Sequence, residues 1–506
     1  MDKTSLWPVK QAEVVKLTLT SIILYLFITL PVISARVFYL DDNRRALLGD
    51  LNWGINGRPL TDFLMTCFSF GTPILDAFPL WQILAGLILT LGSALLFKRF
   101  EIPGGCEAEA IGLSLGGNPL FLQNLSFRFD AFSMALSVVL AIMPCIMPID
   151  RIRLAVSIGG LVLLATLCLY QPSINVFVVL AVTEVALVRG GLRLERLKTL
   201  LAIRTMQLGL SLLFYAFVAK ATLHGSYAEA HHLMSFRACL TALPGQIISL
   251  ANNGYGSLLT SRFRWAFLPP IVSALGVIIL TGATQSMRRY TNGKRWFSLC
   301  LSIVIIPALW LCASFALLVP ILPTSDAPRM FVGIGAVLSS ALLILRSIST
   351  GRSARVLFLA VLLLAVYTEI FVAMTYGNAL AAQTEYEQSI SQELRQDVQR
   401  LVKTERLDQL IVEGNVGYAP LVSRAGNHSF KLLFKLVPIQ LVSDEAGFFT
   451  VGRLQHFGIR LRPISSEYVR RMLVSRAETK EPLVSKPFYT IYVLDSTLFV
   501  QFTHPI

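Results

Sequence analysis

Long apolar runs separated by short polar segments fill most of the chain up to about residue 375. Runs of membrane-crossing length lie at 17–38, 74–97, 131–149, 154–170, 173–188, 200–219, 266–287, 297–319, 330–347 and 355–375. Because about 20 apolar residues in a helix cross the hydrocarbon core of a bilayer, each run predicts a transmembrane helix. Two basic segments, Lys98–Arg99 and Arg151–Arg153, are both expected in the cytoplasm, so an even number of helices must cross the membrane between them. A weaker apolar run at 107–125, together with the run at 131–149, supplies that number. The pattern predicts about eleven transmembrane helices.

The polar pattern changes after Met374, where the hydropathy falls and a region of ordinary soluble composition begins. Residues 383–407 have the charge spacing of a helix. Strands are predicted at 407–416, 430–442, 457–464 and 488–502, and the last of these predicts a hairpin that turns at Asp495–Ser496. The expected fold class is an all-α polytopic membrane protein over residues 1–375, followed by a small C-terminal α+β domain over residues 376–506.

The positive charges orient the predicted helices. Segments that this topology places in the cytoplasm carry about twice as many Lys and Arg residues as the outer loops. The first apolar run follows Lys3, Lys10 and Lys16 and lacks a signal-peptide cleavage site, so we expect a retained helix with a cytoplasmic N-terminus. Because eleven is an odd number of crossings, residues 376–506 are then expected on the opposite side of the membrane, in the periplasm. The positive-inside rule accounts for the cytoplasmic cations but not for the arginines expected on the outer side. Most of these arginines lie in the loops 39–73, 126–130 and 220–265.

The composition favours a membrane protein over a soluble enzyme. Hydrophobic residues make up 54% of the chain, charged residues 15%, and the mean hydropathy is +0.64. The formal net charge of +14 is explained by cationic loops that orient the helices, so nucleic acid is not expected as a partner. Seven cysteines, most of them in apolar runs, predict neither a disulfide framework nor a zinc site. Because His224, His231 and His232 also lack metal-ligand spacing, no metal is expected.

Two adjacent carboxylates, Asp41 and Asp42, follow the first apolar run. A partly desolvated carboxylate at a membrane–water boundary can act as a general base on a sugar hydroxyl, although the pair would also suit a helix cap. Arg44, Arg45 and Arg58 fit a phosphorylated lipid headgroup, because a guanidinium group binds phosphate through a fixed fork of donors. Solvated helix charges are the alternative for the first two arginines.

The same loop contains a predicted amphipathic helix within residues 59–73. Apolar residues recur there every three or four positions, Pro59 lies in the first turn, and Gly71–Pro73 ends the segment. Such a helix is expected to lie in the membrane interface, or to pack as an ordinary loop helix on neighbouring spans. Either placement holds Asp41 and Asp42 close to the bilayer surface.

Further polar residues lie at the outer ends of predicted spans. Arg128 and Asp130 are at a depth where an unpaired charge is costly, so they are expected to face the site or to pair with each other. Tyr170 and Gln171 are candidate sugar hydrogen-bonders, with a tight turn set by Pro172 as the alternative.

Arg262 and Arg264 precede a span beside Trp265, and they are either a second phosphate contact or an interfacial anchor. Glu184 lies inside a span about one turn from Arg189, which predicts an ion pair at the cytoplasmic edge. Glu369, near an outer end, stays open as a cavity residue.

The predicted cytoplasmic segments limit which activated donor the protein can use. The predicted cytoplasmic segments are short, and no GxxxxGK[ST] phosphate loop is present, so ATP or a nucleotide sugar is not expected as a direct substrate. A polyprenyl-phosphate sugar suits an outward-facing site, since its tail can lie between spans while its phosphosugar reaches the outer loops. No cofactor is expected, because this lipid is a substrate.

Four stretches taken together resemble the Gtr type II family of serotype-converting O-antigen glucosyltransferases. They are "YLDDNRRALLG", "WGINGRPLTDFLM", "NPLFLQNLSFRFDAFSMALSVVLA" and "YQPSINVFVVLAV". The similarity covers residues 35–190 and continues weakly to 375, and the elements "GRPL" and "NLSFRFD" are fairly specific in combination.

The resemblance implies a GT-C membrane glycosyltransferase of the bacterial inner membrane. Such an enzyme moves glucose from undecaprenyl-phosphate glucose to a sugar of the lipid-linked lipopolysaccharide O-antigen in the periplasm. A lipid-glucose flippase and a donor-making synthase are implied as partners. The catalytic acid of the first periplasmic loop carries over to Asp41 or Asp42, and Asp42 is favoured because it lies further from the span.

The residues themselves support the same chemistry. Inverting transfer from a β-linked lipid phosphate needs one base for the acceptor hydroxyl, and cations stabilise the leaving phosphate. A transporter or flippase of lipid-linked sugars would need charges in mid-membrane, which this chain lacks apart from Glu184. Two further rival hypotheses are an O-antigen polymerase, which would transfer an oligosaccharide, and a non-catalytic envelope scaffold.

Overall fold

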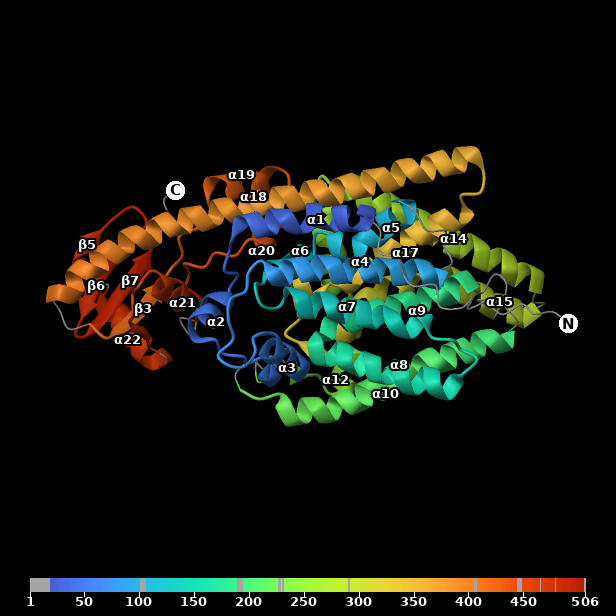
Figure 1. Ribbon diagram of the computed structural model, residues 1–506, viewed down its shortest axis with the longest axis horizontal. Coiled ribbons are helices and arrows are strands. Elements are labelled where there is room, and N and C mark those ends of the chain that lie inside the picture. The colour runs from blue at the N-terminus through green and yellow to red at the C-terminus, as the bar shows by residue number, and fades with distance from the viewer. Residues whose placement is uncertain are drawn as a thin grey trace.

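Apolar helices make up most of the structure, a computed structural model that describes ten segments of the chain. The segments are 19–100, 106–188, 194–225, 229, 232–289, 292–404, 407–443, 448–464, 466–477 and 479–504. Predictions for Lys3, Lys10, Lys16, Arg189 and His231 lie outside them. A bundle of helices forms the larger part of the molecule, and a β-sheet lies at one end of it (Figure 1).

Six helices in the described part of the chain are long and apolar enough to cross a membrane. They lie within α4 (Leu80–Phe100), α8 (Ile152–Leu169), α10 (Leu194–Thr222), α14 (Arg264–Arg289), the helical segment Arg295–Leu318 and α18 (Arg352–Thr404). Shorter apolar helices pack among them, namely α1 (Leu19–Ala35), α7 (Ala131–Ile146), α9 (Ile174–Val188) and α17 (Gly333–Ile348). Their buried side chains form one large apolar cluster, which positions the loops at the end of the bundle that carries α2 (Asp42–Leu48).

The weak predicted span at 107–125 is not one helix. It forms α5 (Cys106–Gly117) and α6 (Leu122–Ser126), and nearly all of it is buried inside the bundle. The break falls at Asn118–Pro119, where proline steers the preceding residue away from helical geometry. The Asn118 side-chain oxygen accepts the N–H groups of Leu120 and Phe121 at 3.1 and 3.3 Å, which stabilises the turn.

The predicted span at 355–375 and the predicted helix at 383–407 are one continuous helix. α18 has 53 residues, and at about 1.5 Å per residue it is about 80 Å long. It runs along the bundle beside α1 and continues to the sheet (Figure 1). Gly377 permits this packing, because a Cβ atom there would lie 2.4 Å from Pro31 on α1.

The C-terminal region contains a five-stranded sheet of order β4-β3-β7-β6-β5. Its strands are β3 (Gln409–Glu413), β4 (Arg462–Pro463), β5 (Val484–Ser485), β6 (Tyr489–Leu494) and β7 (Thr497–Phe502). β3 pairs in parallel with β4 and β7, and the other pairs are antiparallel. The predicted hairpin at Asp495 is confirmed, and Asp495 has the left-handed backbone (φ 56°) that such a turn requires.

One predicted strand in this region is wrong. Residues 430–442 contain the short helix α20 (Leu433–Leu436), whose leucines are buried in the same apolar cluster as the bundle. A segment buried on several sides reads as a strand, since its apolar run shows no helical period. Three further helices were not predicted, α19 (Pro420–His428), α21 (Phe448–His456) and α22 (Glu467–Ala477).

α18 also builds the core of the C-terminal region. Ile390, Leu394 and Val398 of this helix are buried in one cluster with residues of β3, β6 and β7. The same helix thus supplies apolar side chains to the membrane bundle at one end and to the sheet at the other.

Glu184 on α9 is buried and binds two arginines of neighbouring helices. Its carboxylate lies 2.6 Å from Nε of Arg99 on α4 and 2.8 Å from Nε of Arg204 on α10. Arg189, the partner expected from the sequence, lies outside the described residues. The triad joins three helices, because a carboxylate in an apolar interior needs cationic partners wherever packing brings them.

We expect Glu184→Ala to lower the free energy of unfolding by about 3–5 kcal/mol, because it leaves two buried guanidinium groups without their anion. The check is the thermal unfolding midpoint of the purified protein in detergent. Glu393→Ala is the matched control, since Glu393 is partly exposed and pairs with Lys486, so its loss should cost about 1 kcal/mol or less. Equal midpoints for the two variants would contradict the structural role of the triad.

Candidate functional site

Asp41 and Asp42 lie where the chain turns from α1 into α2 (Asp42–Leu48). Leu40 adopts a left-handed backbone (φ 51°), which turns the chain before the two carboxylates. Asp41 occupies the N-cap position of α2, but its side chain makes no capping hydrogen bond. It forms an ion pair with Arg45 one turn along the helix instead. The Asp41 side chain is 27% exposed, whereas the Arg45 side chain is 8% exposed.

Asp42 points into the protein and is completely buried. Its Oδ2 accepts the backbone N–H groups of Tyr39 at 3.1 Å and Arg128 at 2.8 Å, while its Oδ1 has no partner among the described residues. Burial, and next the neighbouring Asp41 carboxylate, raise the pKa of Asp42 well above its ordinary range. Asp42 therefore ties two backbone segments together.

Arg128 clamps the turn between α1 and α2. Its guanidinium donates to the carbonyls of Arg36 and Val37 at 2.8 and 2.9 Å and lies 2.6 Å from Oδ2 of Asp76. The same group stacks on the ring of Phe38, at 3.6 Å from the ring centroid. These contacts use the donors of Arg128 within the protein, and its predicted pairing with Asp130 does not occur.

A chain of polar contacts runs from Arg45 to the buried Asp130. The Arg45 guanidinium lies 4.1 Å from the ring centroid of Trp53, and the indole N–H of Trp53 donates to Asp130 at 2.7 Å. Arg58 contacts the other Asp130 oxygen at 2.9 Å. Burial acts to raise the pKa of Asp130, but the guanidinium groups of Arg58 and Arg45 outweigh it and hold this pKa below its ordinary value.

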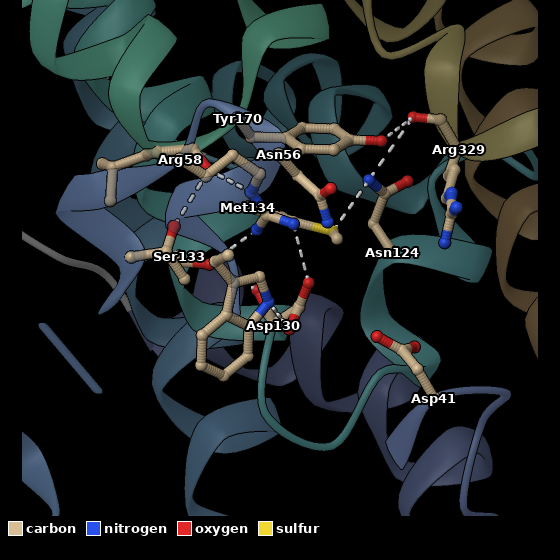
Figure 2. A network of polar contacts seen from close by, with 12 residues as sticks. Asp41, Asn56, Arg58, Asn124, Asp130, Ser133, Met134, Tyr170 and Arg329 are labelled. Atoms are coloured by element: carbon tan, nitrogen blue, oxygen red, sulfur yellow. Dashed lines mark hydrogen bonds and ion pairs between the residues drawn. The ribbon is translucent and has the colours of Figure 1, made fainter. Parts of the chain in front are cut away.

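Figure 2 shows Arg58, Asp130, Ser133 and Tyr170 in one polar cluster, with Asp41 at its edge. Arg58 also donates to the carbonyl of Leu169 at 2.7 Å and is thereby fixed against the end of α8. The Asp41 corner thus rests on side chains whose positions are set by several contacts each.

Trp53 and α3 (Pro59–Phe68) complete the support. The helix predicted within residues 59–73 is confirmed as α3, which ends at Phe68. Its Asp62 accepts the backbone N–H groups of Trp53 and Gly54 at 3.0 and 2.6 Å. Trp53 and Asp62 were not predicted as site residues. The "WGINGRPL" stretch that contains Trp53 is the signal for it, because a tryptophan with its indole N–H buried needs an acceptor.

Tyr170 and Gln171 bind the protein itself. The Tyr170 hydroxyl donates to the carbonyl of Arg329 at 2.8 Å, and the Gln171 amide donates to the Tyr215 hydroxyl at 2.8 Å and to a carbonyl of the 53–57 turn. Their expected role as sugar contacts is not tested by these bonds. They do fix the backbone around the site, which agrees with the alternative of a structural turn at η2 (Gln171–Ser173).

Arg329 is a site candidate that the sequence analysis did not name. Its backbone N–H donates to Gln123 at 2.8 Å, and its carbonyl accepts from Tyr170 and Asn124. Its guanidinium lies 5.0 Å from the ring centroid of Phe127. In Figure 2 the side chains of Arg329 and Asp41 point toward the same region, beside Asn124.

The remaining candidates do not join this network. Arg44 pairs with Asp50 at 3.1 Å near the surface. Arg262 and Arg264 precede and begin α14, where Arg264 lies 5.0 Å from the ring centroid of Trp265. Glu369 on α18 is buried and accepts a hydrogen bond from Ser114 at 2.6 Å. Within the part of the chain that the structure describes, no group of three His, Cys, Asp or Glu side chains is arranged to hold a metal ion.

The C-terminal region covers the turn that carries the two carboxylates. The Tyr39 hydroxyl donates to the carbonyl of Leu436 at 2.6 Å. The His456 ring lies 2.8 Å from the carbonyl of Asn43, and α2 packs against α21. Burial first lowers the pKa of His456, and the nearby Arg453 and Arg128 lower it further, so this ring is neutral at physiological pH.

Chemically, the site offers a partly exposed carboxylate, Asp41, paired with a guanidinium group, and the Asp76 carboxylate is exposed to the same degree beside Arg128. Such a carboxylate can accept a proton from a hydroxyl, and the guanidinium groups can stabilise an anion that forms beside it. Asp42 and Arg128 hold the surrounding backbone instead, and Asp130 holds the side chains of Trp53 and Arg58.

Comparisons with known proteins place this network within a recognised family segment. The family model described as glucosyl transferase GtrII matches residues 30–345. A protein of Salmonella phage P22, described as an uncharacterized 55.3 kDa protein in the gtrB 5' region, is 33% identical over 151 residues. That alignment covers 30% of this chain and 31% of the phage protein, which is about a third of the relative's length. No solved structure matches the chain.

The raised pKa of Asp42 predicts a pH-dependent stability. At pH values below the ordinary Asp pKa of 3.8, this group is protonated in both the folded and the unfolded chain. As the pH rises, the unfolded chain loses this proton first, so the contribution of Asp42 to stability falls until the pH passes the folded-state pKa. The unfolding midpoint of wild type should therefore fall relative to that of Asp42→Asn as the pH rises from about 4. The check is thermal unfolding of both proteins in detergent.

Asp42→Ala serves as the companion variant. It removes the acceptor of two buried N–H groups and should cost about 2–4 kcal/mol, whereas Asn keeps an acceptor oxygen. A wild-type midpoint that rises relative to Asp42→Asn with increasing pH would show that Asp42 is held as the anion.

Proposed function

Because the chain belongs to the GtrII glucosyl transferase family, we propose that it adds glucose to the lipopolysaccharide O-antigen. The proposed donor is undecaprenyl-phosphate glucose, and the proposed acceptor is a sugar of the O-antigen at the periplasmic face of a bacterial inner membrane. A flippase for the lipid-glucose and the synthase that makes it are the proposed partners. The helices long and apolar enough to cross a membrane are consistent with a lipid-borne donor.

The observation that carries the proposal is the partial exposure of Asp41 beside Arg45. A general base must reach the hydroxyl of its substrate, and the Asp41 side chain is 27% exposed, whereas Asp42 is fully buried and bound to two backbone N–H groups. We therefore assign the base to Asp41, in place of the sequence preference for Asp42.

The proposed reaction is a single inverting displacement. The Asp41 carboxylate accepts the proton of the acceptor hydroxyl, whose oxygen forms a bond to the anomeric carbon of glucose. The bond between that carbon and the phosphate oxygen breaks, and the phosphate takes the electron pair. Arg45 orients Asp41 through their ion pair, and the Arg329 guanidinium is the proposed partner of the leaving phosphate. No acid is needed, because the phosphate leaves as a stable anion.

The proposed topology keeps about eleven crossings, a cytoplasmic N-terminus and a periplasmic C-terminal α+β domain. The six long apolar helices, the four shorter ones and the buried α5 support that number. In this arrangement the turn at Asp41 and the C-terminal sheet share the outer side, which agrees with the contacts of Leu436 and His456 with this turn.

Asp41→Asn should reduce glucosyl transfer by about 100-fold or more, since general-base catalysis typically contributes at least that factor. The check is the mass of lipopolysaccharide O-antigen from cells that make the donor lipid, compared at equal protein level. Asp50→Asn is the matched control, because Asp50 lies in the same loop and also pairs with an arginine. It should keep near wild-type transfer.

Asp42→Asn distinguishes the two neighbours. If Asp41 is the base, the Asp42 variant should lose no more than about tenfold in transfer, since its oxygen still accepts backbone N–H groups. Full transfer by Asp41→Asn, together with loss in Asp42→Asn at normal protein level, would reverse the assignment. Full transfer by both variants would remove carboxylate catalysis at this turn.

Alkaline phosphatase fused to the C-terminal end of the full chain should be active in cells, because this enzyme folds only outside the cytoplasm. A green fluorescent protein fusion at the same position, exported through the general secretion route, should be dark. A fluorescent fusion with an inactive phosphatase fusion would place the C-terminal region in the cytoplasm and contradict the proposed topology.

A further inference from the structure

A hollow of about 530 Å³ lies between α19 and the loop that leads into α14. It is lined by Arg262, Leu421, Arg424, Ala425, His428 and Ser429. The two walls lie far apart in the sequence, and they are joined because Arg262 donates to the carbonyl of His428 at 3.3 Å. None of these residues contributes a contact to the Asp41 network.

The hollow is basic and contains no carboxylate among its lining residues. Arg262 and Arg424 are exposed, and neither forms an ion pair with any residue that the structure describes. The sequence between Glu413 and Asp444 contains no acidic residue at all, although it carries several cations. Two arginines left without an anion beside a histidine and a hydroxyl favour an anionic ligand.

The surroundings of the hollow are those of a membrane interface. Phe263, next to Arg262, packs on Phe371 of α18 and on Phe430, with ring centroids 5.9 and 5.1 Å apart. Large apolar side chains are exposed around it: Leu421 at 50% and Trp265 at 64%. An exposed tryptophan at the end of a membrane-crossing helix is typical of the lipid headgroup level.

We propose that this hollow binds the phosphate group of a membrane lipid. The guanidinium groups of Arg262 and Arg424 match phosphate oxygens, Ser429 and His428 can add donors, and Leu421 provides an apolar wall for the start of the lipid chain. Two lipids share this chemistry, a polyprenyl diphosphate and an anionic phospholipid. The inference goes beyond glucosyl transfer, because it requires binding alone.

One chain segment connects the hollow to the turn that carries Asp41. From Ser429 the chain continues through Phe430 into α20, and the carbonyl of Leu436 at the end of α20 accepts the hydroxyl of Tyr39. One short segment therefore lines the hollow and also packs beside the turn that carries Asp41. A lipid held at Arg262 and Arg424 would rest against the segment that covers the catalytic turn.

The test is lipid binding by the full-length protein in detergent, followed by native mass spectrometry. The probes are undecaprenyl diphosphate, phosphatidylglycerol, uncharged undecaprenol and inorganic phosphate. The double variant Arg262→Gln/Arg424→Gln should bind the phosphorylated lipids about tenfold more weakly than wild type. Arg395→Gln/Arg460→Gln is the matched control, since it removes two exposed arginines elsewhere and should stay within about twofold.

Comparison of the four probes identifies which phosphate-bearing lipid the hollow binds. Preference for undecaprenyl diphosphate over phosphatidylglycerol identifies a polyprenyl-linked substrate, and equal binding identifies a phospholipid headgroup. Undecaprenol bound as tightly as its diphosphate, inorganic phosphate bound as tightly as the lipids, or unchanged binding by the double variant overturns the proposal. Asp41→Asn should bind these lipids like wild type, so a failure of glucosyl transfer and a failure of this site are separate results.

Discussion

The cost of burying a charge in an apolar interior organises the described structure. Asp130 is buried with Arg58 and Trp53, Arg128 with Asp76, and Glu184 with two arginines of neighbouring helices. Removing one partner from such a group leaves an uncompensated charge, which costs several kcal/mol. These ionic contacts therefore fix how the helices and the loops between them meet.

Asp41 differs from these buried groups because its side chain is partly exposed, while its neighbours are held by further contacts. Arg45 orients it, Trp53 supports Arg45, and Asp130 anchors Trp53. A reactive carboxylate needs such layered support, since an error of about 1 Å in its position can remove most of its effect. The guanidinium group of Arg45 also compensates the negative charge of Asp41, while the Asp41 side chain stays 27% exposed.

Sequence patterns predicted the elements with a clear hydrophobic period, such as the helix within residues 59–73 and the hairpin at Asp495. They failed where tertiary contacts decide the outcome. The strand predicted at 430–442 is a buried helix and loop. Two predicted helices form the single helix α18, because no proline separates them and Gly377 packs closely against α1. For the site, the loop positions of Asp41, Arg45 and Arg58 were readable, but their partners were not, since Asp130 pairs with Arg58 and not with the nearby Arg128.

The two adjacent carboxylates show why sequence alone could not rank them. Neighbouring residues on a helix project about 100° apart, so Asp41 and Asp42 cannot face the same space. The contacts of Tyr39 decide the direction: its N–H binds Asp42 inside, and its hydroxyl binds the carbonyl of Leu436 from the C-terminal region. The C-terminal region thus helps to set which acid is exposed. Because α18 joins it to the bundle without a break, this region belongs to the architecture of the site and is not a separate attachment.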